Sequence, residues 1–107
     1  MAESNIKALR FELEDMAEMC DRLNYFREEI KSHCEASQKE LDALTQEMSA
    51  LNPDDKHFAQ ISARLAEMTT ASQRCEMELS EVQAKLEECQ HAKRELQQRI
   101  DDMSAAP

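Results

Sequence analysis

The 107-residue sequence contains no glycine and two prolines, and charged residues make up 34% of it while aromatic residues make up 4%. This composition is typical of long helices and argues against a globular domain with many strands and turns. The 13 lysines and arginines face 23 aspartates and glutamates, which gives a net charge of −10 with neutral histidines. Because such a surface repels phosphate, we expect neither nucleic acid nor a membrane as a partner.

The N-terminal sequence MAESNIKALR lacks the basic stretch and apolar segment of a secretory signal. No apolar run approaches the length that spans a bilayer. We therefore expect one soluble, cytoplasmic domain over residues 1–107, whose four cysteines are reduced thiols.

The first predicted helix covers residues 4–51, where heptad a and d positions recur without a slip. The a positions are Ile6, Leu13, Cys20, Arg27, Cys34, Leu41 and Met48. The d positions are Leu9, Met16, Leu23, Ile30, Ser37, Leu44 and Leu51. These residues form a stripe that can pack against a second helix.

The segment LNPDDKHF, residues 51–58, interrupts this helix. Pro53 has no backbone N–H and disfavours the helical conformation at Asn52, so the helix ends near residue 51. Asn52 suits the N-cap of a second helix, and Asp54 and Asp55 place negative charge in its first turn. We predict a turn at 52–54 and a second helix over 55–103 that runs back along the first.

The second helix carries an equally regular stripe. Its a positions are Phe58, Leu65, Ser72, Leu79, Leu86, Lys93 and Ile100, and its d positions are Ile61, Met68, Cys75, Val82, Cys89, Leu96 and Met103. A hairpin that turns at residues 51–55 pairs residues whose numbers sum to 109. This pairing places Ser37 opposite Ser72, Cys34 opposite Cys75, Cys20 opposite Cys89, Arg27 opposite Val82, and Met16 opposite Lys93.

The predicted fold is all-α, an elongated antiparallel coiled-coil bundle. Arg27 and Lys93 lie in the seam, and we expect both to bend outward to nearby acids. An alternative arises at TTASQRC, residues 69–75, where Thr69 and Thr70 weaken the helix and Thr70 with Gln73 has capping-box spacing. A break near 69–73 would give a three-helix bundle in place of the hairpin.

Four large apolar side chains of the first helix lie off the seam at f and g positions: Phe11, Met19, Tyr25 and Phe26. They are either scattered surface hydrophobic residues, which are common, or a second apolar face that is covered by a third helical segment, by self-association or by a client protein. Their concentration on one side of one half of the helix favours the second apolar face. Arg22 and Arg27 flank it.

Catalytic and metal-binding patterns are weak. No glycine-rich loop could hold phosphate, and none of the three histidines accompanies a serine nucleophile. Cys20, Cys89 and His91 would make only a partial zinc site without a fourth ligand. We expect no enzymatic activity, no cofactor, and cysteines that act as small apolar core residues.

Two segments carry a resemblance to a known family. FREEI, residues 26–30, resembles a step in the first helix of tubulin-binding cofactor A proteins, and LAEMTTASQRCEMEL, residues 65–79, is similar to their second helix. The resemblance implies a small cytosolic, cytoskeleton-associated chaperone with three helices that holds β-tubulin during αβ-tubulin assembly without nucleotide or metal. It also implies that Phe26, Arg27, Glu28, Glu29 and Glu67 lie on or near the client-binding surface.

Two functions therefore stand as hypotheses. The first is a tubulin-folding chaperone, for which a monomer is favoured. The second is a structural coiled-coil subunit or tether of a cytoskeletal or ciliary complex, for which a homodimer or a mixed bundle is expected. The candidate partner-binding residues are Phe11, Met19, Arg22, Tyr25, Phe26, Arg27, Glu28, Glu29 and Glu67.

Overall fold

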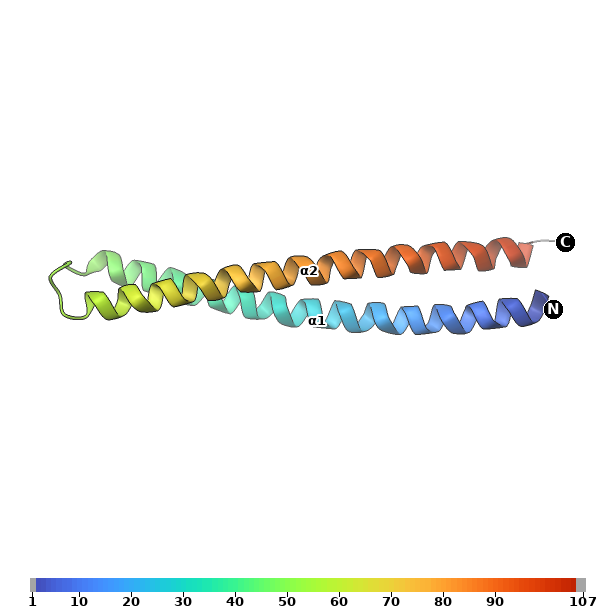
Figure 1. Ribbon diagram of the computed structural model, residues 1–107, viewed down its shortest axis with the longest axis horizontal. Coiled ribbons are helices and arrows are strands. Elements are labelled where there is room, and N and C mark those ends of the chain that lie inside the picture. Colours follow the sequence, from blue (N-terminus) through green and yellow to red (C-terminus); the bar gives the residue numbers. More distant parts are fainter. Residues whose placement is uncertain (1, 106–107) are drawn as a thin grey trace. The chain divides into compact units, whose positions relative to one another are not determined.

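The computed structural model of the chain describes residues 2–105, which form two helices, α1 over Ala2–Ala50 and α2 over Phe58–Ala105 (Figure 1). No strand occurs among these residues. The predicted all-α helical hairpin is confirmed. The three-helix alternative is not formed, because α2 continues unbroken through residues 69–73.

The contacts divide the chain into two units. The terminal unit joins α1 up to Arg27 with α2 from Glu81 onward. The turn unit spans Glu28–Ser80 and contains the connection between the helices. In each unit the two helical segments lie side by side and run in opposite directions (Figure 1).

Two consecutive turns connect the helices. The amide side chain of Asn52 opens the first turn, and the carboxylate of Asp55 opens the second. The Asn52 side-chain oxygen accepts the Asp54 N–H at 3.1 Å, and the Asn52 carbonyl accepts the Asp55 N–H at 2.8 Å. Asn52 therefore stabilises a tight turn around Pro53, whose missing N–H costs nothing there.

The second turn delays the start of α2 to Phe58, three residues after the predicted start at residue 55. The Asp55 carboxylate accepts the His57 N–H at 2.8 Å, and the Asp55 carbonyl accepts the Phe58 N–H at 3.0 Å. The His57 carbonyl then accepts the Ile61 N–H at 3.1 Å, as the first α-helical bond. Asp55, rather than Asn52, therefore satisfies the donors that precede the helix.

The threonines that suggested a break lie inside α2. Each hydroxyl donates to the carbonyl one turn earlier, Thr69 to Leu65 at 2.8 Å and Thr70 to Ala66 at 3.2 Å. Such bonds satisfy the hydroxyl group within the helix and leave the backbone hydrogen bonds of the helix intact. The spacing of Thr70 and Gln73 therefore does not mark a helix start.

Every predicted a and d position is buried or half-buried, from Ile6 to Met103. The most buried apolar residues all lie in this seam: Cys20, Met68, Cys75, Val82, Leu86, Leu96 and Ile100. The sulfurs of Cys20 and Cys89 lie 2.6 Å apart, which is the pairing predicted in the terminal unit. Cys75 lies close enough to Cys34 to raise its pKa, in agreement with the pairing predicted in the turn unit.

One polar layer crosses the seam of the turn unit at Ser37 and Ser72, both 7% exposed. The Ser72 hydroxyl lies 3.4 Å from the side-chain oxygen of Gln38, within reach of a weak hydrogen bond. No buried side-chain nitrogen or oxygen of the described residues lacks a partner. The layer thus costs little, because its polar groups are satisfied.

Neither helix, over the described residues, has a segment both long and apolar enough to cross a membrane.

We predict that Leu86→Ala lowers the free energy of unfolding by about 2 to 5 kcal/mol, because Leu86 is 3% exposed and its loss leaves a cavity in the seam. The matched control is Met77→Ala in the same helix, where the side chain is 65% exposed and the expected change is within about 0.5 kcal/mol. Urea unfolding followed by circular dichroism measures both. Equal losses for the two variants would contradict the assignment of the seam.

Candidate partner-binding surface

Four large apolar side chains of α1 are exposed to solvent in the terminal unit: Phe11 at 59%, Met19 at 57%, Tyr25 at 67% and Phe26 at 51%. At 100° per residue they fall within an arc of roughly 120° and over about 22 Å of helix. We call them the α1 apolar face. Their concentration distinguishes this surface from isolated exposed hydrophobic residues, which are common.

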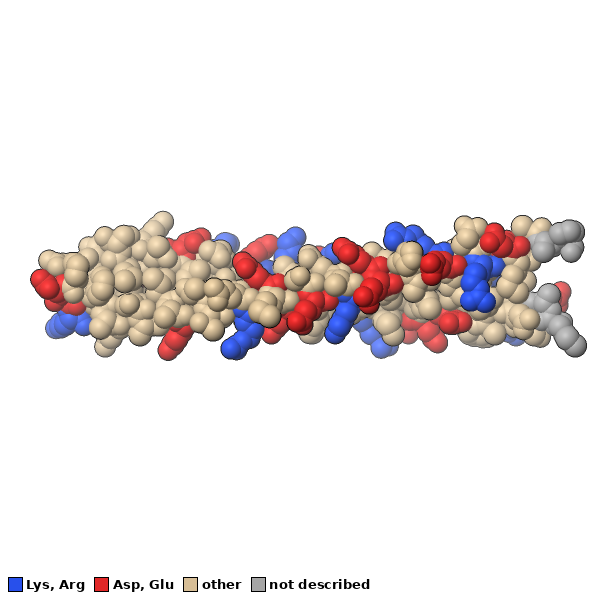
Figure 2. Space-filling view, turned by 45° about the horizontal axis from the view of Figure 1, so that its top comes forward, with Lys and Arg blue, Asp and Glu red and all other residues tan. Residues whose placement is uncertain are grey.

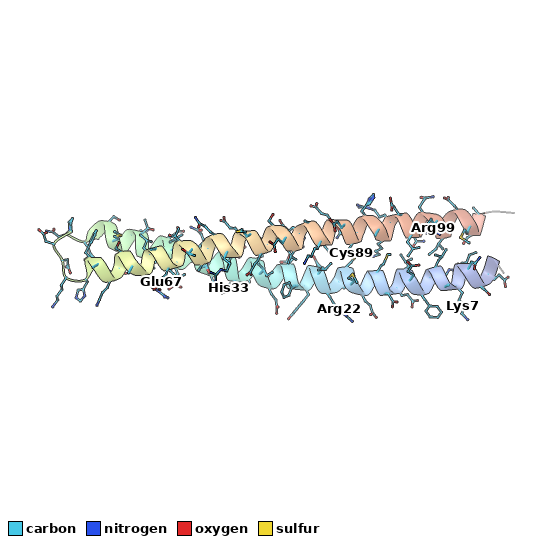
Figure 3. The ribbon with its side chains drawn as sticks, viewed as in Figure 1. Lys7, Arg22, His33, Glu67, Cys89 and Arg99 are labelled. Atoms are coloured by element: carbon cyan, nitrogen blue, oxygen red, sulfur yellow. The ribbon has the colours of Figure 1, made fainter. Side chains whose placement is uncertain are left out.

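Charged side chains are interleaved with the α1 apolar face. Arg22 lies on the side of α1 turned away from α2 (Figure 3), and its side chain is 83% exposed. Its guanidinium lies 3.8 Å from the Glu18 carboxylate, one turn earlier. An exposed pair of this kind contributes little to stability, so Arg22 can exchange this contact for one with a partner.

On the side of the molecule shown in Figure 2, acidic and basic side chains alternate along much of its length, with a larger uncharged area beside the turn. With Arg22 and Glu18 beside it, the α1 apolar face combines aromatic, methionine and charged groups. Such a composition is typical of protein interfaces, whose cores are enriched in aromatic residues, Met and Arg.

A shallow groove between α1 and α2 adjoins Met19 in the terminal unit. Its lining consists of Met16, Met19, Leu23, Lys85, Glu88, Cys89 and Ala92. Ala92 is half-buried, and its small side chain leaves room between the longer side chains around it. The groove provides a concave apolar site next to the exposed face.

The α2 side of this groove was missed by the sequence prediction. Lys85 and Ala92 occupy g positions of α2, and in an antiparallel pair these lie beside the g positions of α1, where Met19 and Phe26 lie. The heptad register alone places these g positions side by side, but it was applied only to the a and d positions of the seam.

Of the residues suggested by the family resemblance, Arg27 is partly withdrawn into the seam. It is half-buried at its seam position, and its guanidinium donates to the Asn24 side-chain oxygen at 2.7 Å in an exposed hydrogen bond. A half-buried stem with an exposed charged group is expected for a long cationic side chain. Arg27 serves the helix pair as well as any partner surface.

Glu28, Glu29 and Glu67 are exposed and belong to the turn unit. Glu67 lies 3.5 Å from Arg64, which in turn lies 2.9 Å from Glu40 on α1. The hydrogen bond with Glu40 raises the pKa of Arg64 above its usual value. Glu67 is therefore part of an ion network that links the two helices of the turn unit.

The cysteines form two thiol pairs across the seam. The Cys89 thiol also lies 3.6 Å from the Met16 carbonyl oxygen. The hydrogen bond with Cys20, and then burial, raise the pKa of Cys89 to about 11, while the charge of Lys93 opposes the rise. Burial, the hydrogen bond with Cys75, and the nearby acids Glu76 and Glu78 raise the pKa of Cys34 to about 11.

Among residues 2–105 no group of three His, Cys, Asp or Glu side chains is arranged to hold a metal ion. His91, considered as a partner of the cysteines, instead lies 3.0 Å from Glu95 on the exposed surface of α2. Its side chain is 68% exposed.

Compared with protein-family models, curated proteins and solved structures, the chain shows no match.

We predict that the chain loses stability as the pH rises from about 9 to about 11, because the folded state holds the Cys34 and Cys89 protons more tightly than the unfolded state. This stabilisation is fully present below the unfolded pKa and disappears as the pH passes the raised, folded pKa. Thermal unfolding under reducing conditions measures it.

The control is Cys34→Ala/Cys89→Ala, which removes both thiol protons and leaves every other side chain in place. The melting temperature of the variant should fall less over this range than that of the wild type. The same slope for both proteins would contradict the role of the thiols.

Proposed function

We propose that the chain is a non-enzymatic tubulin-folding chaperone that binds β-tubulin through the α1 apolar face during αβ-tubulin assembly. The observation that carries the binding role is the exposure of Phe11, Met19, Tyr25 and Phe26 on one side of α1. These four side chains lie outside the a and d positions that form the buried and half-buried seam.

The energetics favour a partner on this face. Complete burial of one such side chain contributes about 1.5 to 3 kcal/mol, so a partner that covers Met19 and Phe26 gains a substantial part of its binding energy from two residues. The groove beside Met19 offers space for an apolar side chain of the partner. The helix pair thus presents both a projecting and a concave contact.

The negative charge of the chain limits which part of β-tubulin it can contact. With a net charge of −10, the chain would repel the acidic tails of tubulin. Arg22 is a highly exposed cation beside the apolar face, and Arg27 carries a second positive charge at its edge. We therefore infer contact with the folded body of β-tubulin through Arg22, Phe26 and Arg27.

The identity of the client rests on the resemblance of residues 26–30 and 65–79 to tubulin-binding cofactor A proteins. The first of these segments includes Phe26, at the end of the α1 apolar face. The second lies within α2 in the turn unit, where Glu67 contacts Arg64.

A second candidate is a structural coiled-coil subunit or tether of a cytoskeletal or ciliary complex. The observation that favours it is the unbroken α2, which gives a two-helix chain where the family resemblance implies three helices. A two-helix chain leaves one side of α1 open for the helices of an assembly partner. In this case the α1 apolar face is a permanent interface.

We predict that the wild-type chain is a monomer that co-elutes with β-tubulin, released from the heterodimer, as a one-to-one complex. Met19→Ala/Phe26→Ala should weaken this complex roughly tenfold or more, because two anchors of the face are lost. Size-exclusion chromatography with light scattering gives the masses, and a titration gives the affinity.

Met77→Ala is the matched control, since it removes an exposed apolar side chain, at 65% slightly more exposed than Met19, from the turn unit. It should bind as the wild type does, and circular dichroism should show equal helicity for all variants. A stable dimer that does not bind β-tubulin would exclude the chaperone and favour the coiled-coil subunit. Equal weakening by both variants would exclude the α1 apolar face as the binding site.

A further inference from the structure

We propose that hydrogen peroxide converts the two thiol pairs into intramolecular disulfides, Cys20–Cys89 in the terminal unit and Cys34–Cys75 in the turn unit. Each bond ties α1 covalently to α2 within its unit. This is an oxidative modification site, and it is independent of the function proposed for the α1 apolar face.

The positions of the sulfurs carry the proposal. All four cysteines are free thiols in the structure. The sulfurs of Cys20 and Cys89 are 2.6 Å apart, not far beyond the ~2.05 Å of a disulfide bond. After burial, Cys75 contributes to the raised pKa of Cys34, so these two thiols also lie close together across the seam. The sulfurs of Cys20 and Cys89 thus already face each other, and Cys75 lies close enough to Cys34 to raise its pKa.

Helix geometry leaves one connectivity. Four cysteines allow about three pairings in principle. Cys20 and Cys34 lie fourteen residues apart on α1, as do Cys75 and Cys89 on α2, and fourteen residues of helix span about 21 Å. A disulfide requires Cα atoms within roughly 7 Å, so two cysteines of one helix cannot bond. Cys20 contacts Cys89 and is thereby held away from Cys75.

Each pair combines one buried thiol with one that borders a surface groove. Cys20 and Cys75 are each 6% exposed. Cys89 is half-buried and lines the groove beside Met19. Cys34 is also half-buried and lines a groove of the turn unit with Lys31, Glu35, Gln38, Ser72, Glu76 and Leu79. A small oxidant can reach the bordering thiol, whose buried partner is the nearest nucleophile.

The reaction balances with peroxide as the oxidant. The Cys89 thiolate attacks one peroxide oxygen, the O–O bond breaks, and the departing hydroxide takes up a proton and leaves as water. This step leaves a sulfenic acid on Cys89. The Cys20 sulfur then attacks the Cys89 sulfur, the S–S bond forms, and the hydroxyl leaves as a second water with the Cys20 proton. Cys34 and Cys75 react in the same way.

The raised pKa values of Cys34 and Cys89 set the rate of the first step, because only the thiolate attacks peroxide. The charged groups beside Cys89 are Lys85, Glu88 and Lys93, all from α2. Those around Cys34 are Lys31 and Glu35 from α1, and Glu76 and Glu78 from α2. Oxidation should therefore be slow at neutral pH and accelerate about tenfold per pH unit below pH 11.

The test treats the folded, reduced chain with hydrogen peroxide, blocks the remaining thiols with iodoacetamide, and maps the disulfides without reduction. Trypsin cleaves after Lys and Arg and so places each of the four cysteines on a separate peptide. The expected result is the Cys20–Cys89 and Cys34–Cys75 peptide pairs as the dominant products. The melting temperature should rise by on the order of 10 °C, since both bonds close long loops.

Three variants sharpen the test. Cys20→Ala should abolish only the first pair, and Cys34→Ala only the second. Cys20→Ala/Cys34→Ala is the matched control, because its two remaining thiols lie on α2 and should form no intramolecular disulfide. If a variant fails to fold, the disulfide map of the oxidised wild-type chain still tests the predicted pairing.

Dominant pairs of Cys20 with Cys34, or of Cys75 with Cys89, would overturn the proposal. So would disulfides mainly between chains, or the same mixture of pairings with and without urea. Conversion of Cys89 to sulfinic acid without a disulfide would show that Cys20 does not reach it, and would overturn it as well.

Discussion

The structure depends on one constraint, the unbroken alternation of three and four residues between seam positions in both halves of the chain. Because the alternation never slips, each half presents a continuous stripe, and the turn at Pro53 sets the two stripes in register. Contacts in both units follow this register. Cys20 lies against Cys89 in the terminal unit, and Cys34 lies close to Cys75 in the turn unit. The polar layer at Ser37 and Ser72 follows from the same alignment.

The same constraint explains why the α1 apolar face is notable. The seam accounts for every buried apolar residue of the described chain, so Phe11, Met19, Tyr25 and Phe26 do not belong to its buried core. Exposed aromatic and methionine side chains on a highly charged chain carry a solubility cost. The proposed partner would give them a role, with the neighbouring groove as a defined contact.

Much of the fold was predictable because heptad spacing is a local pattern that needs no knowledge of the partner helix. All seam positions were identified in this way, and so was the end of α1 at Pro53. The start of α2 was not, since two residues, Asn52 and Asp55, both have capping side chains and the sequence does not rank them. The hydrogen bonds show that Asn52 opens a turn and that Asp55 leads into the helix.

The candidate surface was predictable only in part. Exposure of the f and g side chains follows from the register of α1 alone. The groove beside Met19 was missed, because part of its lining, including Ala92, comes from the other helix. The salt bridge between Glu67 and Arg64 was also missed, because Arg64 is positioned by a second salt bridge, with Glu40 on the other helix. Features to which both helices contribute cannot be predicted from the heptad pattern of either helix alone.

The central claim is that one chain folds on itself with seam residues whose numbers sum to 109. Methyl NOE spectroscopy on leucine-labelled protein tests it most directly. The account predicts contacts of Leu23 with Leu86 in the terminal unit and of Leu44 with Leu65 in the turn unit, all within one chain. Contacts displaced by a heptad, or contacts seen only between differently labelled chains in a mixed sample, would contradict it.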